Sequence, residues 1–326
     1  MLVTDELARD EKGRSVRELF AKDPRVASAR VRLAGEVLVP GGTPWTSRAE
    51  LFSAGIDSLA PQVNGIVVDL LDYGSRSGTA PRALLVVLRA AASKSVPVFI
   101  LDRPNPVTGE HIEGPVLDSA AAASDGVYGL PQRHGMTVGE MAQYFNAAGK
   151  IGATLTVVPV RGWRRSQWPS ERGLQLPGQP RKPGSLILAN AFELCAATNL
   201  TCDGGGVSAP WLTPQLVSAL KDRLMPGVDF NGLTGLSGGG MRHLRVEIEN
   251  PDQATGSRIM AAILSELVRL YPRQLVIDRA RMAELSGSDS FAGAILAGED
   301  SDTAVDRTLP VLAAFKRRAK DAYIYR

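Results

Sequence analysis

Residues 81–106 of the chain read PRALLVVLRAAASKSVPVFILDRPNP. The part up to Lys94 carries apolar residues at helical spacing, and Pro81 falls in the expected first turn, where proline is tolerated. The part from Pro97 to Leu101 is a short apolar run, which is typical of a buried strand. A helix that leads into a buried strand is the repeating unit of a parallel sheet, so this stretch favours an α/β fold.

The same alternation extends on both sides of this unit. Strands are predicted at about residues 2–4, 30–34, 65–70, 97–101 and 154–160, and helices over residues 15–20, 47–59 and 81–94. A further helix is expected to begin at Thr137, because Thr137 and Glu140 have the spacing of a capping box. The first half of the chain is therefore predicted to be a parallel α/β domain.

The second half has a different character. Residues 161–183 hold several prolines, two tryptophans and little periodicity, which indicates a linker or a loop that covers a site. Beyond it, helices are expected within residues 213–225, 254–271 and 308–324, and a strand within residues 241–250. This composition predicts a smaller α+β domain.

The bulk composition excludes several classes of protein. The 37 basic and 34 acidic residues give a net charge of +3, too even to predict a nucleic-acid or bilayer surface. The basic clusters at residues 161–165 and 316–320 are interpreted as solvated faces. Two cysteines do not make a disulfide framework, and we expect free thiols, with a single bridge as the alternative in an exported protein. No apolar run is long enough to span a membrane, and the charged start does not resemble a secretory leader, so the chain as written is expected in the cytoplasm.

Polar residues follow several of the predicted strands. Ligands of open parallel sheets bind beyond the carboxyl ends of the strands, so we expect these side chains to lie near one another. Carboxylates and a histidine at one edge suit acid/base hydrolysis, in which one group is protonated while another is ionised. The candidates are Glu36, Asp69, Asp72, Arg76, Asp102, Arg103, Asn105, Glu110, Glu113, Arg133 and His134.

Each candidate also has a structural alternative. Asp69 would then cap a turn, Asp102 and Arg103 would pair with each other, and His134 would be a satisfied core residue. The glycine-rich segments CDGGG and GGGMRHL lack the strand and helix context of a nucleotide loop, and three scattered histidines give no metal-ligand spacing. No cofactor or metal is therefore predicted.

The proline turn and the segments around it resemble a known family. LDRPNP, followed by IEGP and then by QRHGMTVGEMAQYFN, is similar to the exo-β-N-acetylmuramidase family (NamZ-type), bacterial enzymes that trim terminal N-acetylmuramic acid from peptidoglycan fragments. The segments LVTDELARDEKGRSVRELFAKDPRV, VVDLLDYGSRSGT, FELCAATNLTCDGGGVSAPWL and KDAYIYR resemble further parts of the family. The resemblance covers nearly the whole chain.

The resemblance implies a Rossmann-like domain over residues 1–162, a smaller α+β domain over residues 163–326 and a sugar site in the cleft between them. It also implies an exo-acting glycoside hydrolase that removes β-linked N-acetylmuramic acid. Glu36 is expected to be the general acid, and Asp69 or Asp72 to assist water or stabilise the transition state. Glu113 and His134 complete the predicted catalytic set. The groups expected to bind the sugar and its lactyl carboxylate are Arg76, Asp102, Arg103, Asn105 and Arg133, with His134 beside them.

Departures from the family's motifs leave a second hypothesis open. Gly35 and Val37 flank Glu36 where the family has proline and histidine, and Cys202 replaces a glutamate. The alternative is therefore an inactive relative that binds muropeptide or another glycan without cleaving it. A dinucleotide-binding enzyme would rest on fold analogy alone. The expected partner is a peptidoglycan-derived sugar or muropeptide, and a periplasmic or secreted location follows if a leader precedes the chain. The sequence does not determine the oligomeric state.

Overall fold

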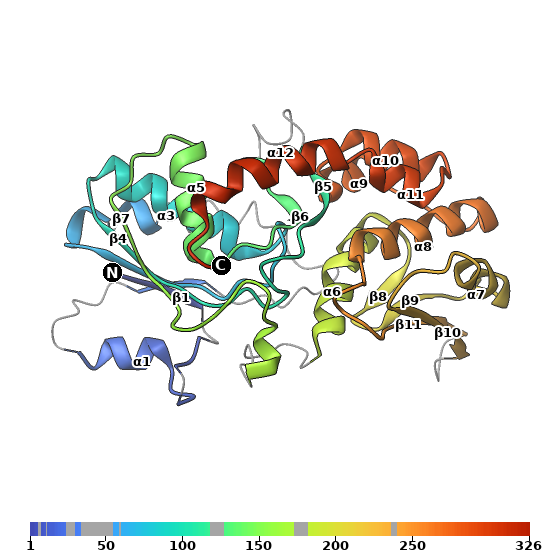
Figure 1. Cartoon of the computed structure of the whole chain (residues 1–326), viewed down its shortest axis with the longest axis horizontal. Helices are drawn as coiled ribbons and strands as arrows, with labels where there is room; N and C mark the ends of the chain where they lie inside the picture. Colours follow the sequence, from blue (N-terminus) through green and yellow to red (C-terminus); the bar gives the residue numbers. More distant parts are fainter. Residues whose placement is uncertain are drawn as a thin grey trace.

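The fold is described from a computed structural model, over residues 1–5, 8–10, 12–23, 30–33, 55–58, 60–117, 127–172, 182–235 and 240–326. Within these ranges the chain forms two regions with separate apolar cores, joined by the terminal helix (Figure 1). No helix in this described part is long and apolar enough to cross a membrane.

A parallel five-stranded sheet organises the first region. Its strands lie in the order β2-β1-β3-β4-β7, and every neighbouring pair is parallel. The order reverses direction between β1 and β3, as in doubly wound folds. The strands are β1 (Leu2–Asp5), β2 (Arg30–Leu33), β3 (Ile66–Asp69), β4 (Val98–Leu101) and β7 (Leu155–Val158).

Helices on both faces of this sheet complete the region. The helices α3 and α5 lie on one face and α1 on the other (Figure 1). The capping box predicted at α5 is present: the Thr137 hydroxyl accepts from the backbone of Glu140, whose carboxylate accepts from the backbone of Thr137. The helical segments are α1 (Val16–Ala21), residues 55–58, η1 (Ala60–Gln62), α3 (Thr79–Ser93), α5 (Val138–Ala148) and η2 (Pro169–Arg172).

A short hairpin leads from the first sheet toward the second region. The strands β5 (Glu113–Val116) and β6 (Pro131–Arg133) pair antiparallel, and β5 contacts α8 and α12. The tryptophans of the proline-rich segment are packed inward. Trp163 meets the ring of Tyr325 edge-on at 4.7 Å, and the indole nitrogen of Trp168 donates to Asp252 at 2.8 Å. The described part of this segment is therefore packed against the rest of the protein.

The second region is an antiparallel sheet with helices against it. Its strand order is β10-β11-β9-β8, and the segment CDGGG forms the turn between β8 and β9. The strands are β8 (Thr201–Asp203), β9 (Gly206–Ala209), β10 (Val228–Gly235) and β11 (Arg242–Ile248). The helices are α6 (Pro183–Ala191), η3 (Phe192–Ala197), α7 (Pro214–Lys221), α8 (Gly256–Leu270), α9 (Arg279–Ser286), α10 (Asp289–Leu296) and α11 (Ser301–Asp306).

The terminal helix returns to the first region. Helix α12 (Leu309–Ala319) contributes Leu312, Phe315 and Ala319 to the first core, and η4 (Lys320–Ala322) contributes Ala322. Tyr325 then reaches the end of β4, where its hydroxyl donates to Asp102 at 2.7 Å. The boundary predicted between residues 162 and 163 stays a prediction.

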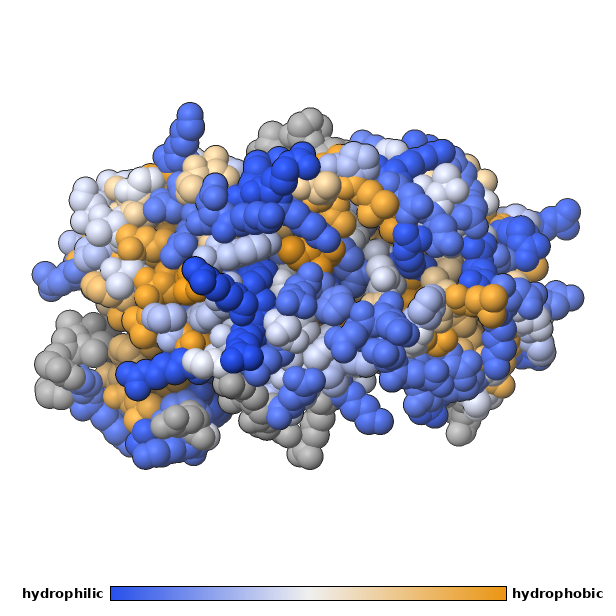
Figure 2. Space-filling view, in the orientation of Figure 1, coloured by the Kyte–Doolittle hydropathy of each residue, from blue (hydrophilic) through white to orange (hydrophobic). Residues whose placement is uncertain are grey.

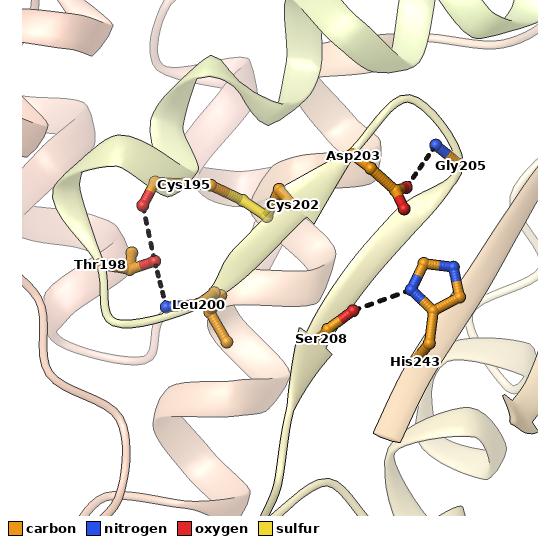
Figure 3. Close-up of a disulfide and its surroundings, with 8 residues drawn as sticks. All are labelled: Cys195, Thr198, Leu200, Cys202, Asp203, Gly205, Ser208 and His243. Atoms are coloured by element: carbon orange, nitrogen blue, oxygen red, sulfur yellow. Dashed lines mark hydrogen bonds between the residues drawn. A yellow bond between two sulfur atoms is a disulfide. The ribbon is translucent and has the colours of Figure 1, made fainter. Parts of the chain in front are cut away.

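The expectation of free thiols is wrong, because Cys195 and Cys202 form a disulfide (Figure 3). The bridge ties η3 to β8 across a tight turn. In that turn the Thr198 hydroxyl donates to the carbonyl of Cys195 at 2.8 Å and accepts from the backbone of Leu200 at 3.1 Å. The chain reversal brings two residues seven positions apart within bonding reach, which no spacing rule predicts for a lone pair of cysteines.

Candidate active site

The candidate site lies beside the carboxyl edge of the parallel sheet. Asp5 and Asp69 end β1 and β3, the two strands at which the order reverses and where ligands of such folds bind. Three segments meet next to this edge: the loop 70–78 after β3, residues 131–135 of β6 and its extension, and the start of η3. Ser75 links all three segments. Its backbone forms an isolated antiparallel β-bridge with Arg133, and its hydroxyl donates to Oε1 of Glu193 at 2.7 Å.

Asp69 and Arg103 form a two-pronged ion pair at this edge. Nε of Arg103 donates to Oδ1 of Asp69 at 2.6 Å, and Nη2 donates to Oδ2 at 3.0 Å. The same Nη2 donates to the carbonyl of Arg9 at 3.0 Å. The side chain of Arg103 therefore pairs with Asp69 and not with its neighbour Asp102.

Asp72 and His134 face each other in the interior. Nε2 of His134 lies 3.4 Å from Oδ2 of Asp72, and Nδ1 accepts from the backbone of Met136 at 3.1 Å. Because Nδ1 accepts, the proton of the neutral ring is assigned to Nε2, on the side of Asp72. Gly74 turns the loop with φ +77° and donates to Oδ2 at 2.9 Å, while a side chain at this position would strike Val107. Asp72 is thus fixed through one oxygen.

Glu113 and Arg133 join the two regions. Nη1 of Arg133 donates to Oε1 of Glu113 at 3.0 Å, and Nη2 donates to the carbonyl of Val107. The other oxygen of Glu113 accepts from the backbone and the hydroxyl of Ser257, both at 3.2 Å, in the first turn of α8. The guanidinium lies over the ring of Trp168, 5.6 Å from its centroid. Burial lowers the pKa of Arg133, and Glu113 opposes that change.

Glu193 belongs to this cluster, although sequence reasoning assigned it no role. It begins η3 in the segment FELCAA, where an acid among buried apolar residues was the available signal. Oε1 accepts from the Ser75 hydroxyl at 2.7 Å. Burial raises the pKa of Glu193, opposed by hydrogen bonds from Ser75 and Ser77 and by the charges of Arg76 and Arg82. The protonated form is therefore favoured to a higher pH than in an ordinary glutamate.

Polar atoms without partners converge on this place. Among the described residues, eight buried side-chain oxygen or nitrogen atoms have no hydrogen-bond partner, and six of them belong to these three segments. Buried polar groups are normally satisfied, so a group of orphans in one place indicates a site for a ligand or for water. The six atoms are Asp72 Oδ1, Tyr73 Oη, Gln132 Oε1, Arg133 Nε, His134 Nε2 and Glu193 Oε2.

Backbone contacts hold these segments in place. The side-chain amide of Gln132 donates to the backbone carbonyl of Asn190 at 3.0 Å, and the side-chain amide of Asn190 donates to the backbone carbonyl of Tyr73 at 3.2 Å. Burial, with added repulsion from Asp5 and Asp72, raises the pKa of Tyr73 to about 12, so its hydroxyl stays protonated at neutral pH. The cluster thus offers protonated donors beside ionisable carboxylates.

Arg76, Asp102 and Asn105 have structural partners. The guanidinium of Arg76 donates to four backbone carbonyls, those of Pro115, Leu130, Leu285 and Ser286. The carboxylate of Asp102 accepts from Thr137, Gly139, Tyr325 and the backbone of Arg103. Asn105 donates to Met136 and accepts from Val107. Their predicted contacts with substrate stay predictions.

Two predicted acids remain: Glu110 is exposed on the surface, and Glu36 lies outside the described residues. In the described part no group of three or more histidine, cysteine, aspartate or glutamate residues is arranged to hold a metal ion. A surface pocket of about 260 Å³ lies elsewhere, lined by residues such as Arg223, Leu224 and Arg258 of the second region. None of these three lining residues belongs to the buried cluster.

Two sequence models of one family match this chain. The N-terminal model of exo-β-N-acetylmuramidase NamZ matches residues 56–180, and its C-terminal model matches residues 206–325. The peptidoglycan β-N-acetylmuramidase NamZ of Bacillus subtilis is 27% identical over 282 residues, which cover 81% of this chain and 68% of that protein.

Two solved structures share the fold. Both are DUF1343 family proteins from Bacteroides fragilis, and the matches cover 100% of this chain and 93% of each of theirs. One has a TM-score of 0.80 at 21% identity and the other a TM-score of 0.69 at 17% identity. With the family models matching both regions, and the predicted mixed α/β architecture confirmed, this chain belongs to the exo-β-N-acetylmuramidase NamZ family.

Proposed function

We propose that this protein is an exo-acting glycoside hydrolase that removes terminal β-linked N-acetylmuramic acid from peptidoglycan fragments. The observation that carries the proposal is the convergence of six unpartnered buried polar atoms, two of them carboxylate oxygens, between the two regions. Glycoside hydrolysis needs one carboxyl that donates a proton and a second that stays ionised. Family membership supplies the substrate class.

Glu193 is proposed as the general acid. A general acid must hold its proton near the working pH, and burial raises the pKa of Glu193 in that direction. Oε2 is buried and free of partners among the described residues, while Ser75 fixes the other oxygen. Glu36, which the family register favours, is the competing acid and is tested beside it.

Asp72 is proposed as the second carboxylate. Its Oδ2 is held by Gly74 and faces Nε2 of His134, which leaves Oδ1 free to orient water or to stabilise an oxocarbenium-like transition state. Arg133, whose Nε has no partner in the described structure, is proposed to bind the lactyl carboxylate. Arg103 and Asp69, paired at the sheet edge, would border the same space.

Two substrates with different leaving groups distinguish the general acid from the second carboxylate. Hydrolysis of p-nitrophenyl β-N-acetylmuramide releases a leaving group that departs without protonation, whereas a muramic acid–glucosamine disaccharide needs the general acid. We expect Glu193→Gln to lose about 100-fold or more in kcat on the disaccharide and far less on the aryl glycoside. Asp72→Asn should lose activity on both, since its role does not depend on the leaving group.

Glu36→Gln and the exposed Glu284→Gln complete the set. A selective loss in Glu36→Gln, with Glu193→Gln unaffected, would move the acid to Glu36. Tight binding of the disaccharide by a wild type that cleaves neither substrate would make the protein the inactive glycan-binding relative. Glu284 pairs with Arg281 on the surface of α9, so its substitution should leave both activities unchanged.

The disulfide favours an oxidising compartment over the cytoplasm. Cytosolic thiols are kept reduced, whereas disulfides persist in the periplasm and outside the cell. We therefore propose that the protein acts outside the cytoplasm, where peptidoglycan fragments arise. Alkylation of intact cells before lysis, followed by mass measurement, would show Cys195 and Cys202 unmodified; alkylated thiols on both would contradict the proposal.

A further inference from the structure

Two basic clusters that lie far apart in the sequence belong to segments that contact each other. Arg161 and Arg164 follow β7, and Lys316, Arg317 and Lys320 occupy the end of α12 and η4. All five side chains belong to exposed residues, and we call them the basic strip. Figure 2 shows hydrophilic side chains crowding the surface around the end of α12 and the C-terminus.

Specific contacts bring the clusters together. The segment after η4 runs along the loop that carries Arg161 and Arg164. The backbone of Arg165 donates to the carbonyl of Arg326 at 3.3 Å, and the backbone of Val160 donates to the Tyr325 hydroxyl at 2.8 Å. The inward-facing Arg165 pairs with Glu140 at 2.6 Å and lies 3.7 Å above the ring of Tyr323. The strip is therefore built on a fixed base.

The basic strip has no ion pair among the described residues. Arginines of the second region differ, because Arg258 binds Asp302 and Asp306, and Arg269 binds Glu266. Within the stretch itself Asp321 is an exposed acid. The five cations of the strip therefore outnumber this acid of the same stretch.

Helix electrostatics explain only part of this arrangement. The helix dipole favours cations near a helix C-terminus, and this accounts for Lys316 and Arg317 in the last turn of α12. Arg161 and Arg164 belong to a loop after β7, so the dipole of α12 does not account for them. Lys316 and Lys320, four residues apart, also repel each other. Local stability therefore does not explain why the two clusters meet.

The segment that follows the strip contacts the end of β4. Tyr325, within the segment that joins the clusters, donates to Asp102 at 2.7 Å, and Asp102 directly precedes Arg103 of the sheet edge.

We propose that the basic strip binds an extended polyanion, a polymer chain bearing repeated phosphate or carboxylate groups. A membrane surface fits less well, because Trp163 and Tyr325 are turned inward and the exposed apolar residues Leu309 and Val311 stand at the other end of α12. The strip recruits the protein to such a polymer and leaves the buried cluster free to act, so this inference does not depend on the reaction proposed above.

The test compares two triple variants of the whole protein. Arg164→Gln, Arg317→Gln and Lys320→Gln together remove three charges from the strip. The matched control, Lys94→Gln, Lys150→Gln and Arg273→Gln, removes three exposed charges elsewhere, the two lysines at the opposite edge of the parallel sheet. Binding to linear polyphosphate and to poly-glutamate is measured by titration between about 50 and 200 mM salt, the range over which polyanion binding responds strongly.

We expect the strip variant to bind about tenfold more weakly at the lower salt and to show a salt slope reduced by about 2, while the control matches the wild type. Binding to one polymer alone would identify phosphate or carboxylate as the recognised group. Equal loss in both variants would overturn the proposal, since net charge would then be the cause. No binding to either polymer, or binding only to anionic lipid vesicles, would overturn it as well.

Discussion

At the scale of single residues, the site depends on carboxyl groups whose surroundings set their protonation. Glu193 has one oxygen bonded to Ser75 and the other buried without a partner, and desolvation raises its pKa, which favours the acid form. Asp72 has different neighbours, because the backbone N–H of Gly74 and the Nε2 side of His134 face its Oδ2. Two carboxyls with different surroundings are what acid and base roles require.

Ser75→Ala tests this difference. The Ser75 hydroxyl donates to Glu193 and favours its ionised form, so its loss should raise the pKa of Glu193 further. A general acid works while protonated, and activity falls as pH rises through its pKa. The descending limb of the pH profile on the disaccharide should therefore move to higher pH in Ser75→Ala. A limb that stays in place, or moves to lower pH, would contradict the assignment.

The stability of the folded protein gives a second readout for Glu193. Its pKa is raised on folding, so the stability linked to this group is present at low pH and is lost as pH rises through the folded-state value. The unfolding temperature of Glu193→Gln, measured across this pH range, should therefore lack the fall that Glu193 causes in the wild type. This measurement needs no substrate, so it checks the burial of the carboxyl separately from catalysis.

At the scale of elements, sequence reasoning succeeded where the local pattern decides the structure. All five strands of the parallel sheet were predicted, because short apolar runs that alternate with helical patterns are typical of such sheets. The capping box of α5 was predicted because it needs only two residues at fixed spacing. The strands β8, β9 and β10 were missed, since they are short or half-exposed and their pairing depends on β11.

The site was harder to predict, for a reason visible in Glu193. Its partner Ser75 is 118 positions away, and no periodic pattern relates two such residues. Asp72 was predicted because it follows a strand, and His134 was predicted because it lies in the QRHGMT motif that resembles the family. Their mutual contact, like the Cys195–Cys202 bridge, follows only from the tertiary fold.

The disulfide provides a prediction for the turn between η3 and β8. It closes a loop with a sequence separation of 7, for which a chain-entropy estimate gives about 2–3 kcal/mol. We expect the double variant Cys195→Ser and Cys202→Ser to lose about that much unfolding free energy in denaturant titrations. Reducing the wild type should lower its stability to a similar level and leave the double variant unchanged. Unequal losses from the two treatments would show that the serines, and not the missing bridge, cause the effect.

At the scale of the whole molecule, buried polar residues hold the two regions together. Arg76 donates to Pro115 and Leu130 on one side and to Leu285 and Ser286 on the other. Gly287, at φ +73°, ends α9 beside it, and a side chain there would come within 2.8 Å of the guanidinium. The geometry at this junction therefore suits an arginine fork and a glycine.

Arg76→Lys should weaken this junction. A lysine cannot reach four carbonyls in two directions, and each buried carbonyl left unpaired costs about 1–3 kcal/mol, so we expect a loss of about 3 kcal/mol or more. Arg89→Lys, on an exposed part of α3, is the control and should change stability by less than about 0.5 kcal/mol. Urea titration measures both variants, and equal stabilities would contradict a structural role for Arg76.

The return of α12 to the first region has a consequence for synthesis on the ribosome. The first core is completed by Leu312, Phe315 and Ala319, and Glu140 accepts from the backbone of Ile324, 184 positions later. A nascent chain that has already produced the parallel sheet must therefore wait for its last segment before that core can close. Until then its apolar surface stays open to chaperones, and folding cannot proceed simply from the first region to the second.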